Sequence, residues 1–107
     1  MRKVIVESPY AGDVEANVAY ARRAIADCVK RGEAPIASHL LFTQPGILDD
    51  QKPEERVLGI NCGFAWYDAA DAIVFYTDRG ISQGMSNALI LAREKGKGIE
   101  MRRLHDD

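Results

Sequence analysis

Residues 72–92 read AIVFYTDRGISQGMSNALILA and predict a strand, a turn and a helix in that order. The run 72–77 is apolar and rich in β-branched and aromatic residues, which is typical of a buried strand. The turn contains Gly80 and Gly84, and from Ser82 onward the apolar residues follow helical spacing. In α/β proteins a ligand binds beyond the carboxyl end of such a strand, beside the free N–H groups of the helix. This stretch therefore predicts an α/β fold with a ligand site in the turn 78–86.

The rest of the chain alternates strands and helices around this unit. Helix ends are marked by Asp13 as an N-cap, by Gly32 after a last turn, and by Pro53 in a first turn. The predicted strands are 3–8, 34–39, 72–77 and 99–104, and the predicted helices are 14–31, 53–67 and 82–95. This βαβαβαβ order predicts a Rossmann-like three-layer sandwich with a mainly parallel four-stranded sheet. We expect one domain spanning residues 1–107.

Composition excludes several classes of function. The net charge of −2 gives no basic surplus for binding duplex nucleic acid. No apolar run is long enough to cross a bilayer and the first residues do not resemble a signal peptide, so we expect no membrane partner and a cytoplasmic protein. Cys28 and Cys62 lack metal or redox spacing and are expected to be buried free thiols, and with His39 and His105 they predict no metal site. No cofactor is predicted.

Two predicted helices carry more apolar residues than one covered face needs. The helix 53–67 has a second set, Leu58, Cys62 and Ala65, which predicts that it is covered on two sides. The helix 82–95 is apolar nearly all round. Because a monomer of this size has little interior to hide that surface, we expect a homo-oligomer through helix 82–95.

The ligand site is expected where the loops after the first and third strands meet, at residues 8–13 and 78–86. Glycines there let the backbone approach a ligand, Ser82 serves as N-cap or phosphate contact, and Arg79 is placed to meet a phosphate. Each of these residues also has a purely structural explanation, as a turn, cap or packing residue. The candidate ligand-binding residues are Ser8, Tyr10, Gly12, His39, Asp78, Arg79, Gly80, Ser82, Gly84 and Met85.

Two kinds of catalytic residue fit the same loops. Residues 80–84 match G-x-S-x-G, the nucleophile elbow, with Ser82 as nucleophile and His105 or His39 as base. The chain is far shorter than the fold that uses this motif, which favours the simpler role of Ser82 as a cap. Glu7 and Asp78 end the first and third strands, so either carboxylate is the candidate base or nucleophile if the protein is an enzyme.

The sequence resembles the nucleoside 2-deoxyribosyltransferase-like superfamily, and most closely a group of short, often phage-borne domains within it. The resemblance covers nearly the whole chain, in VIVESPYAGD (4–13), in the segment 37–76, and in GISQGMSNALILAREKGKGIEMRRL (80–104). It implies a Rossmann-like sheet that binds a nucleoside or nucleotide, often in oligomers that complete the pocket. In the enzymes of this superfamily a glutamate one turn into the last helix attacks the sugar, assisted by a nearby acid.

The chain departs from that pattern at the catalytic positions. Aligning Gly84 with the family's glycine places Ala88 at the glutamate and Ser82 at the assisting acid. An alanine cannot attack a sugar carbon. The resemblance therefore implies that a nucleotide, or a signal such as an ADP-ribose-type or cyclic nucleotide, is bound without turnover, as by a phage sponge. The alternatives are an N-glycosidase or 2-deoxyribosyltransferase acting on (deoxy)nucleoside 5′-monophosphates with a relocated carboxylate, at Glu7 or Asp78, and a protein-binding module that uses helix 82–95.

Overall fold

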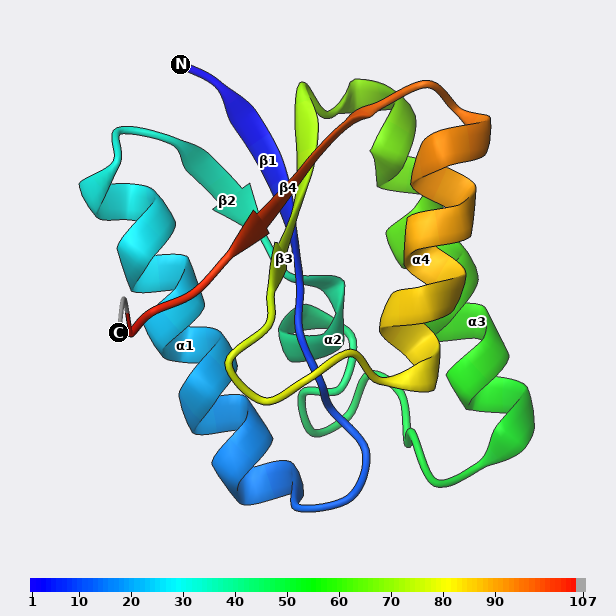
Figure 1. Cartoon of the computed structure of the whole chain (residues 1–107). Coiled ribbons are helices and arrows are strands. Elements are labelled where there is room, and N and C mark those ends of the chain that lie inside the picture. The colour runs from blue at the N-terminus through cyan, green and yellow to red at the C-terminus, as the bar shows by residue number, and fades with distance from the viewer. Residues whose placement is uncertain (106–107) are drawn as a thin grey trace.

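Four parallel strands form the centre of the fold in a computed structural model that describes residues 1–105 (Figure 1). They are β1 (Lys3–Glu7), β2 (Ala34–Ile36), β3 (Ala72–Tyr76) and β4 (Gly98–Arg102), and their order in the sheet is β2-β1-β3-β4. All three strand pairs are parallel, with Val4 of β1 opposite Ala72 of β3 and Ala72 opposite Gly98 of β4. The predicted four-stranded parallel sheet is confirmed. The last two residues of the predicted domain, 106 and 107, lie outside the described residues.

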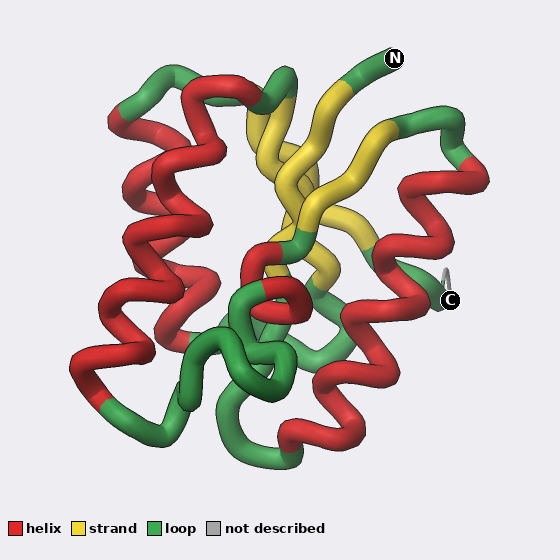
Figure 2. The backbone as a smooth tube through the Cα atoms, turned by 180° about the vertical axis from the view of Figure 1, so that it is seen from behind, coloured by secondary structure: helices red, strands yellow, loops and turns green. Residues whose placement is uncertain are grey.

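Helices cover both faces of the sheet, which confirms the three-layer sandwich (Figures 1 and 2). The helix α1 (Val14–Lys30) lies on one face, and α3 (Pro53–Ala65) and α4 (Gln83–Glu94) lie on the other. The side chains of β1 alternate accordingly. Val4 and Val6 pack in the cluster that includes Tyr20 of α1, and Ile5 packs in the cluster that includes Met85 of α4. Because both faces are covered, the central strands read as unbroken apolar runs.

The helix ends follow the local sequence signals. The Asp13 carboxylate accepts a hydrogen bond from the Ala16 N–H at 3.2 Å and caps α1, and Gly32 follows its end with φ +80°. Pro53 is the first residue of α3, and Ser82 caps α4. These ends depend on contacts within a few residues, which is why the sequence predicted them.

The predicted second strand, 34–39, is wrong beyond Ile36. The chain turns there into a short helix, α2 (Ser38–Leu41), so His39 lies in a helix. Buried Ala37 and half-buried Leu40 both contact the core on the α1 side. A helical turn brings two residues three apart to one surface, whereas a strand would turn them to opposite faces.

The predicted covering of helix 53–67 on two sides is also wrong. Val57, Leu58 and Cys62 are exposed, so Cys62 is an exposed thiol, while Cys28 is buried as expected. The one buried residue of α3 is Gly63, where an added Cβ would lie 2.5 Å from Ser38 Oγ. The helix α3 therefore packs closely against α2 at Gly63, and its second apolar set is left exposed. The chain continues from α3 into a 3-10 turn, Trp66–Ala69, that carries the buried Tyr67.

The apolar surface of α4 lies mostly inside the single chain. Met85, Ala88 and Ala92 are buried, and Leu89 and Leu91 pack partly against them. Ile90, in contrast, is exposed. The surplus that suggested an oligomer through helix 82–95 is therefore smaller than the sequence indicated, and most exposed apolar side chains on this side belong to α3. Within residues 1–105, the helices are all too short or too polar to span a bilayer.

Candidate functional site

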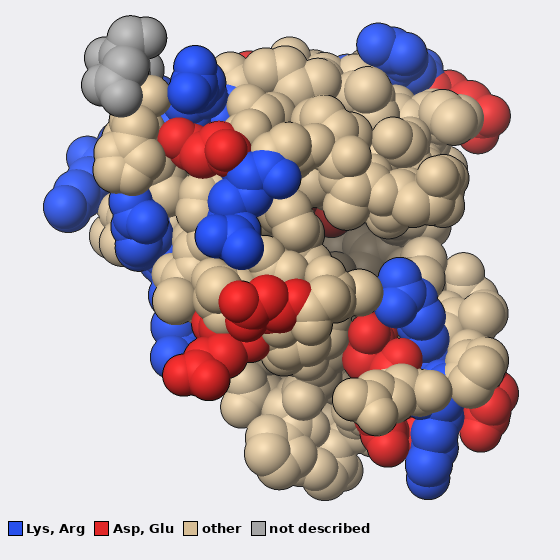
Figure 3. Space-filling view, turned by 60° about the horizontal axis from the view of Figure 1, so that its bottom comes forward, with Lys and Arg blue, Asp and Glu red and all other residues tan. Residues whose placement is uncertain are grey.

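In the sheet, β2 lies on one side of β1 and β3 lies on the other. The direction of strand order therefore reverses between β1 and β3, at the carboxyl ends of these two strands. Open α/β sheets bind ligands at this point. A cavity of about 270 Å³ lies there, and Figure 3, which brings this edge of the molecule forward, shows a hollow with charged side chains around it. Its walls come from the end of β1, from α2 and the loop after it, from α3, and from the start of α4.

Glu7 is the last residue of β1 and lines this cavity. Burial raises the pKa of its carboxyl to about 7, although a hydrogen bond from the Tyr67 hydroxyl to Oε2, at 2.5 Å, acts in the opposite direction. Near neutral pH this carboxyl therefore exists in both forms. It can donate a hydrogen bond when protonated and accept one when ionised.

Ser8 and His39 form a neutral polar pair on the same wall. Ser8 Oγ and His39 Nε2 are hydrogen-bonded at 2.8 Å, and burial lowers the pKa of His39 to about 4. The other ring nitrogen, Nδ1, is buried without a hydrogen-bond partner among the described residues. The Tyr10 ring lies nearly perpendicular to the imidazole, with centroids 6.4 Å apart. At neutral pH His39 thus adds polarity to the cavity but no charge.

The first turn of α4 forms the opposite wall. Ser82 Oγ accepts a hydrogen bond from the Met85 N–H at 3.2 Å, and the Ser86 N–H bonds the Ser82 carbonyl. Gln83 and Gly84, which lie between Ser82 and Met85 in the sequence, line the cavity. The N–H groups at the start of a helix have no partner within it, and together they carry a partial positive charge.

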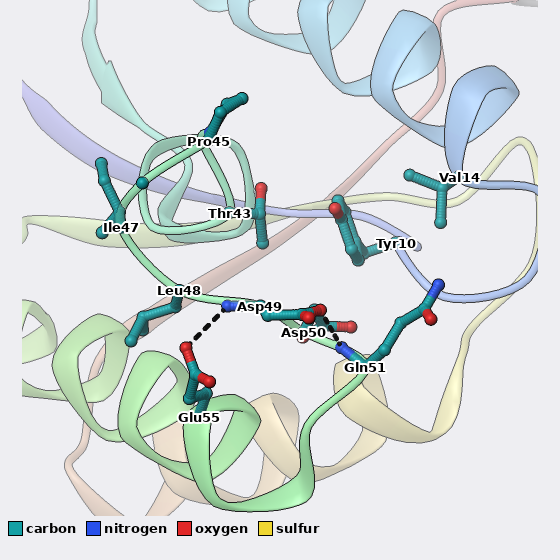
Figure 4. Close-up of a pocket in the computed structure, with 11 residues that line it drawn as sticks. Tyr10, Val14, Thr43, Pro45, Ile47, Leu48, Asp49, Asp50, Gln51 and Glu55 are labelled. Atoms are coloured by element: carbon teal, nitrogen blue, oxygen red, sulfur yellow. Dashed lines mark hydrogen bonds between the residues drawn. The ribbon is translucent and has the colours of Figure 1, made fainter.

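A wider groove of about 600 Å³ adjoins the cavity and shares Tyr10, Thr43, Leu48, Asp50 and Glu55 with it (Figure 4). The loop beside it is held by hydrogen bonds from the Asp49 N–H to Glu55 Oε1 and from the Gln51 N–H to Asp49 Oδ1, both 3.0 Å. The cavity is thus one end of a longer depression.

The structure brings seven of the predicted site residues to the cavity and leaves four outside its lining. Those in the lining are Glu7, Ser8, Tyr10, His39, Ser82, Gly84 and Met85. Gly12, Asp78, Arg79 and Gly80 are not among the residues that line it. Gly12 and Gly80 have positive φ and shape the two loops, and Arg79 Nε donates a hydrogen bond to Asn17 Oδ1.

Asp78 is occupied by the chain itself. Its carboxylate accepts hydrogen bonds from the Tyr20 hydroxyl at 2.6 Å and from the N–H groups of Leu104 and His105. Burial opposes ionisation, but these hydrogen bonds prevail and lower the pKa of Asp78 to about 2. This aspartate joins α1 and the end of the chain to the loop after β3.

In the described part of the chain, Ser82 is not hydrogen-bonded to either histidine that could serve as its base in a nucleophile elbow. Ser82 Oγ caps its own helix, His39 pairs with Ser8, and His105 Nε2 lies 3.0 Å from a guanidinium nitrogen of Arg23.

Ala88, aligned with the family's glutamate, is buried in the core, and the neighbouring Asn87 lines the cavity instead. The carboxylates of the cavity come from β1, the loop and α3.

Apart from His39, the wall made by α2, the following loop and α3 was not predicted from the sequence. Its members include Phe42, Thr43, Leu48, Asp50, Glu55, Arg56, Ile60 and Phe64. The available signal was the stretch 40–48, in which apolar residues lie on both sides of Pro45-Gly46. Such an apolar content is unusual for a loop that faces only solvent.

Comparison with known proteins gives a family but no activity. No curated protein matches the chain. Residues 2–102 match DUF7768, which is described as a domain of unknown function. Because this match includes all four strands and both walls of the cavity, the chain belongs to the DUF7768 family.

Proposed function

We propose that the protein binds a nucleotide or nucleotide-derived small molecule in the inner cavity and holds it without cleaving it. The observation that carries this proposal is the cavity at the carboxyl ends of β1 and β3, with the start of α4 as one wall and Ala88 turned into the core. Its volume is near the lower end of the range typical of ligand pockets, roughly 300 Å³. The likeness to the nucleoside 2-deoxyribosyltransferase-like superfamily supports the ligand class.

The lining suits a nucleoside in two ways. Tyr10, Phe42 and Phe64 offer aromatic surface against which a base can pack. Ser82, Gln83 and Asn87 offer hydroxyl and amide groups for the hydroxyls of a sugar. A holder of this kind would act as a sponge for a nucleotide signal in the cytoplasm, or in the host cytoplasm if the protein is phage-encoded.

A second candidate, an N-glycosidase or deoxyribosyltransferase, is favoured by Glu7. A carboxyl with a pKa of about 7 at a cavity wall is suited to transfer a proton to a departing base. Of the two carboxylates expected from the sequence, Asp78 is bound by Tyr20 and the chain end, so this alternative depends on Glu7.

One incubation separates the two candidates. The protein is mixed with a panel of nucleosides, nucleotides and ADP-ribose-type compounds, and the filtrate is analysed before and after heat denaturation. A compound that disappears and returns intact supports the holder. A free base that Glu7→Gln abolishes supports the glycosidase, with Glu94→Gln, at the far end of α4, as the charge-matched control. A panel that is neither retained nor cleaved contradicts both.

We further propose that two copies associate through the outer face of α3 together with Ile90. Val57, Leu58 and Ile90 are each at least 55% exposed and Trp66 is 49% exposed, and exposed apolar side chains of this size are those that an interface would cover. Sedimentation should show a dimer at micromolar concentration, and Leu58→Lys should give a monomer. A wild-type protein that sediments as a monomer contradicts this proposal.

A further inference from the structure

The charged side chains around the inner cavity are mostly acidic. Its lining contains the carboxyl groups of Glu7, Asp50 and Glu55, and its only cationic side chain among the described residues is Arg56. That guanidinium lies 3.2 Å from Asp50 Oδ2 and is thereby already paired. Protonation of Glu7 would remove one of these negative charges but would add no positive one. His39 is neutral at physiological pH, so the described lining has no unpaired positive side chain.

The adjoining groove adds one carboxylate to this acidic surplus. Asp49 lines the groove together with Asp50 and Glu55, which also line the cavity, and none of the described residues that line the groove is basic. Figure 4 shows Asp49, Asp50 and Glu55 on the same side of the groove, opposite Tyr10. A ligand that extends from the cavity into the groove therefore passes two or three carboxylates.

One feature of the wall favours a single negative charge. The start of α4 provides the equivalent of about half a positive charge. That offsets one phosphate charge in part, but it cannot offset two when carboxylates stand nearby.

We propose that the inner cavity selects nucleoside-type ligands with at most one negative charge, such as nucleosides and cyclic mononucleotides, and rejects nucleoside diphosphates and ADP-ribose. This inference rests on the proposed function and narrows it. It chooses between the two kinds of signal that the sequence left open, because a cyclic mononucleotide carries one charge whereas ADP-ribose carries a pyrophosphate with two. Glu7 in its protonated form adds a hydrogen-bond donor for an uncharged acceptor on the ligand.

The experiment is calorimetric titration at fixed low ionic strength with four matched series. For adenine, guanine, cytosine and uracil, the series comprises the nucleoside, its 3′,5′-cyclic monophosphate and its 5′-diphosphate, and ADP-ribose is added to the adenine series. In the series that binds, we expect the diphosphate to bind at least about tenfold more weakly than the nucleoside or the cyclic monophosphate.

Two variants test the electrostatic cause. Asp50→Asn keeps the shape of the side chain, releases Arg56 and removes one carboxylate, so the preference against the diphosphate should shrink by about threefold or more. Glu94→Gln removes a carboxylate from the far end of α4 and should leave the preference unchanged.

The outcomes separate this inference from the proposed function. Binding of a diphosphate or ADP-ribose as tightly as the nucleoside overturns the inference alone, as does an Asp50→Asn preference equal to that of the wild type. If none of the four series binds, the proposed function fails and this inference fails with it.

Discussion

Replacing Glu7 by glutamine should stabilise the protein, and only above the acid range. Glutamine keeps the shape of the side chain and an oxygen that accepts the Tyr67 hydrogen bond, but it cannot ionise. Well below pH 4.5 the glutamate is protonated in the folded and unfolded chains alike, so it contributes no difference. Between pH 4.5 and about 7 the unfolded chain releases this proton first, and the wild-type protein loses stability as the pH rises.

The size of the effect follows from the change in pKa. Raising the pKa of one carboxyl from 4.5 to about 7 costs the ionised folded protein about 3 kcal/mol. At pH 8 the Glu7→Gln variant should therefore exceed the wild type by about 3 kcal/mol in free energy of unfolding, and at pH 4.5 the two should agree. For a domain of this size, the melting temperature should rise by more than about 10 °C at pH 8.

The comparison must be made between the two proteins, because the wild-type profile hides the effect. His39 has its pKa lowered from 6.5 to about 4 by burial. It binds its proton more readily in the unfolded chain, so its contribution to stability rises with pH from about 4 to 6.5. This rise opposes the fall due to Glu7 over nearly the same range. Subtracting the wild-type profile from that of the variant removes the shared histidine.

Urea unfolding at pH 5, 6, 7 and 8 measures this difference, with Glu94→Gln as the control. Glu94 is exposed at the end of α4, so its replacement should change stability by less than about 0.5 kcal/mol at each pH. If Glu7→Gln gains under about 1 kcal/mol at pH 8, or gains equally at pH 5 and pH 8, the carboxyl is not held in an unfavourable site. Either result would refute a raised pKa of Glu7 in the folded protein.

Three other substitutions test the packing that holds the site. Arg102→Met removes two hydrogen bonds of 2.8 and 2.7 Å from the buried carboxylate of Glu33, which keeps its ion pair with Arg2, and should cost about 2–3 kcal/mol in urea unfolding, part of it regained when Glu33→Gln is added; a loss under about 1 kcal/mol would contradict this. Gly63→Ala places a methyl group 2.5 Å from Ser38 Oγ and should cost about 1–3 kcal/mol, and Ser38→Gly in the same chain should restore part of it; an unchanged melting temperature would show that α2 and α3 separate freely. Ser82→Ala removes the cap of α4 and should lower stability by about 1 kcal/mol, whereas Ser82→Asp should retain it; equal values for both variants would count against the cap.

The sheet and the helix ends could be predicted because their causes are local. Val4 to Val6 and the run from Ala72 to Tyr76 are buried on both faces, and such strands show in the sequence as unbroken apolar runs. Asp13 and Ser82 bond N–H groups three residues ahead. Strand order also predicted where the candidate site lies, since the topology brings the carboxyl ends of β1 and β3 together, although Asp78, Arg79 and Gly80 do not line the cavity.

The second wall of the site could not be predicted, because it depends on contacts between distant segments. Gly63 fits against Ser38 only when α2 and α3 are already folded. Val57 and Leu58 have the spacing of core residues but face outward, and periodicity cannot distinguish an interface from an interior. Asp78 was placed correctly at the end of β3, but its partners, Tyr20 and the N–H of Leu104, come from other parts of the chain.

The same glutamine variant also distinguishes holding from cleavage. The amide of glutamine donates a hydrogen bond as a protonated carboxyl does, but it cannot give up a proton to a leaving group. If the protein only holds its ligand, the affinity of Glu7→Gln should therefore lie within about threefold of the wild-type affinity at pH 6. Between pH 6 and pH 8 the affinity of the variant should fall less than that of the wild type. If it cleaves, the variant should bind and no longer release free base. A variant that binds and cleaves as the wild type does at both pH values would leave Glu7 without either role.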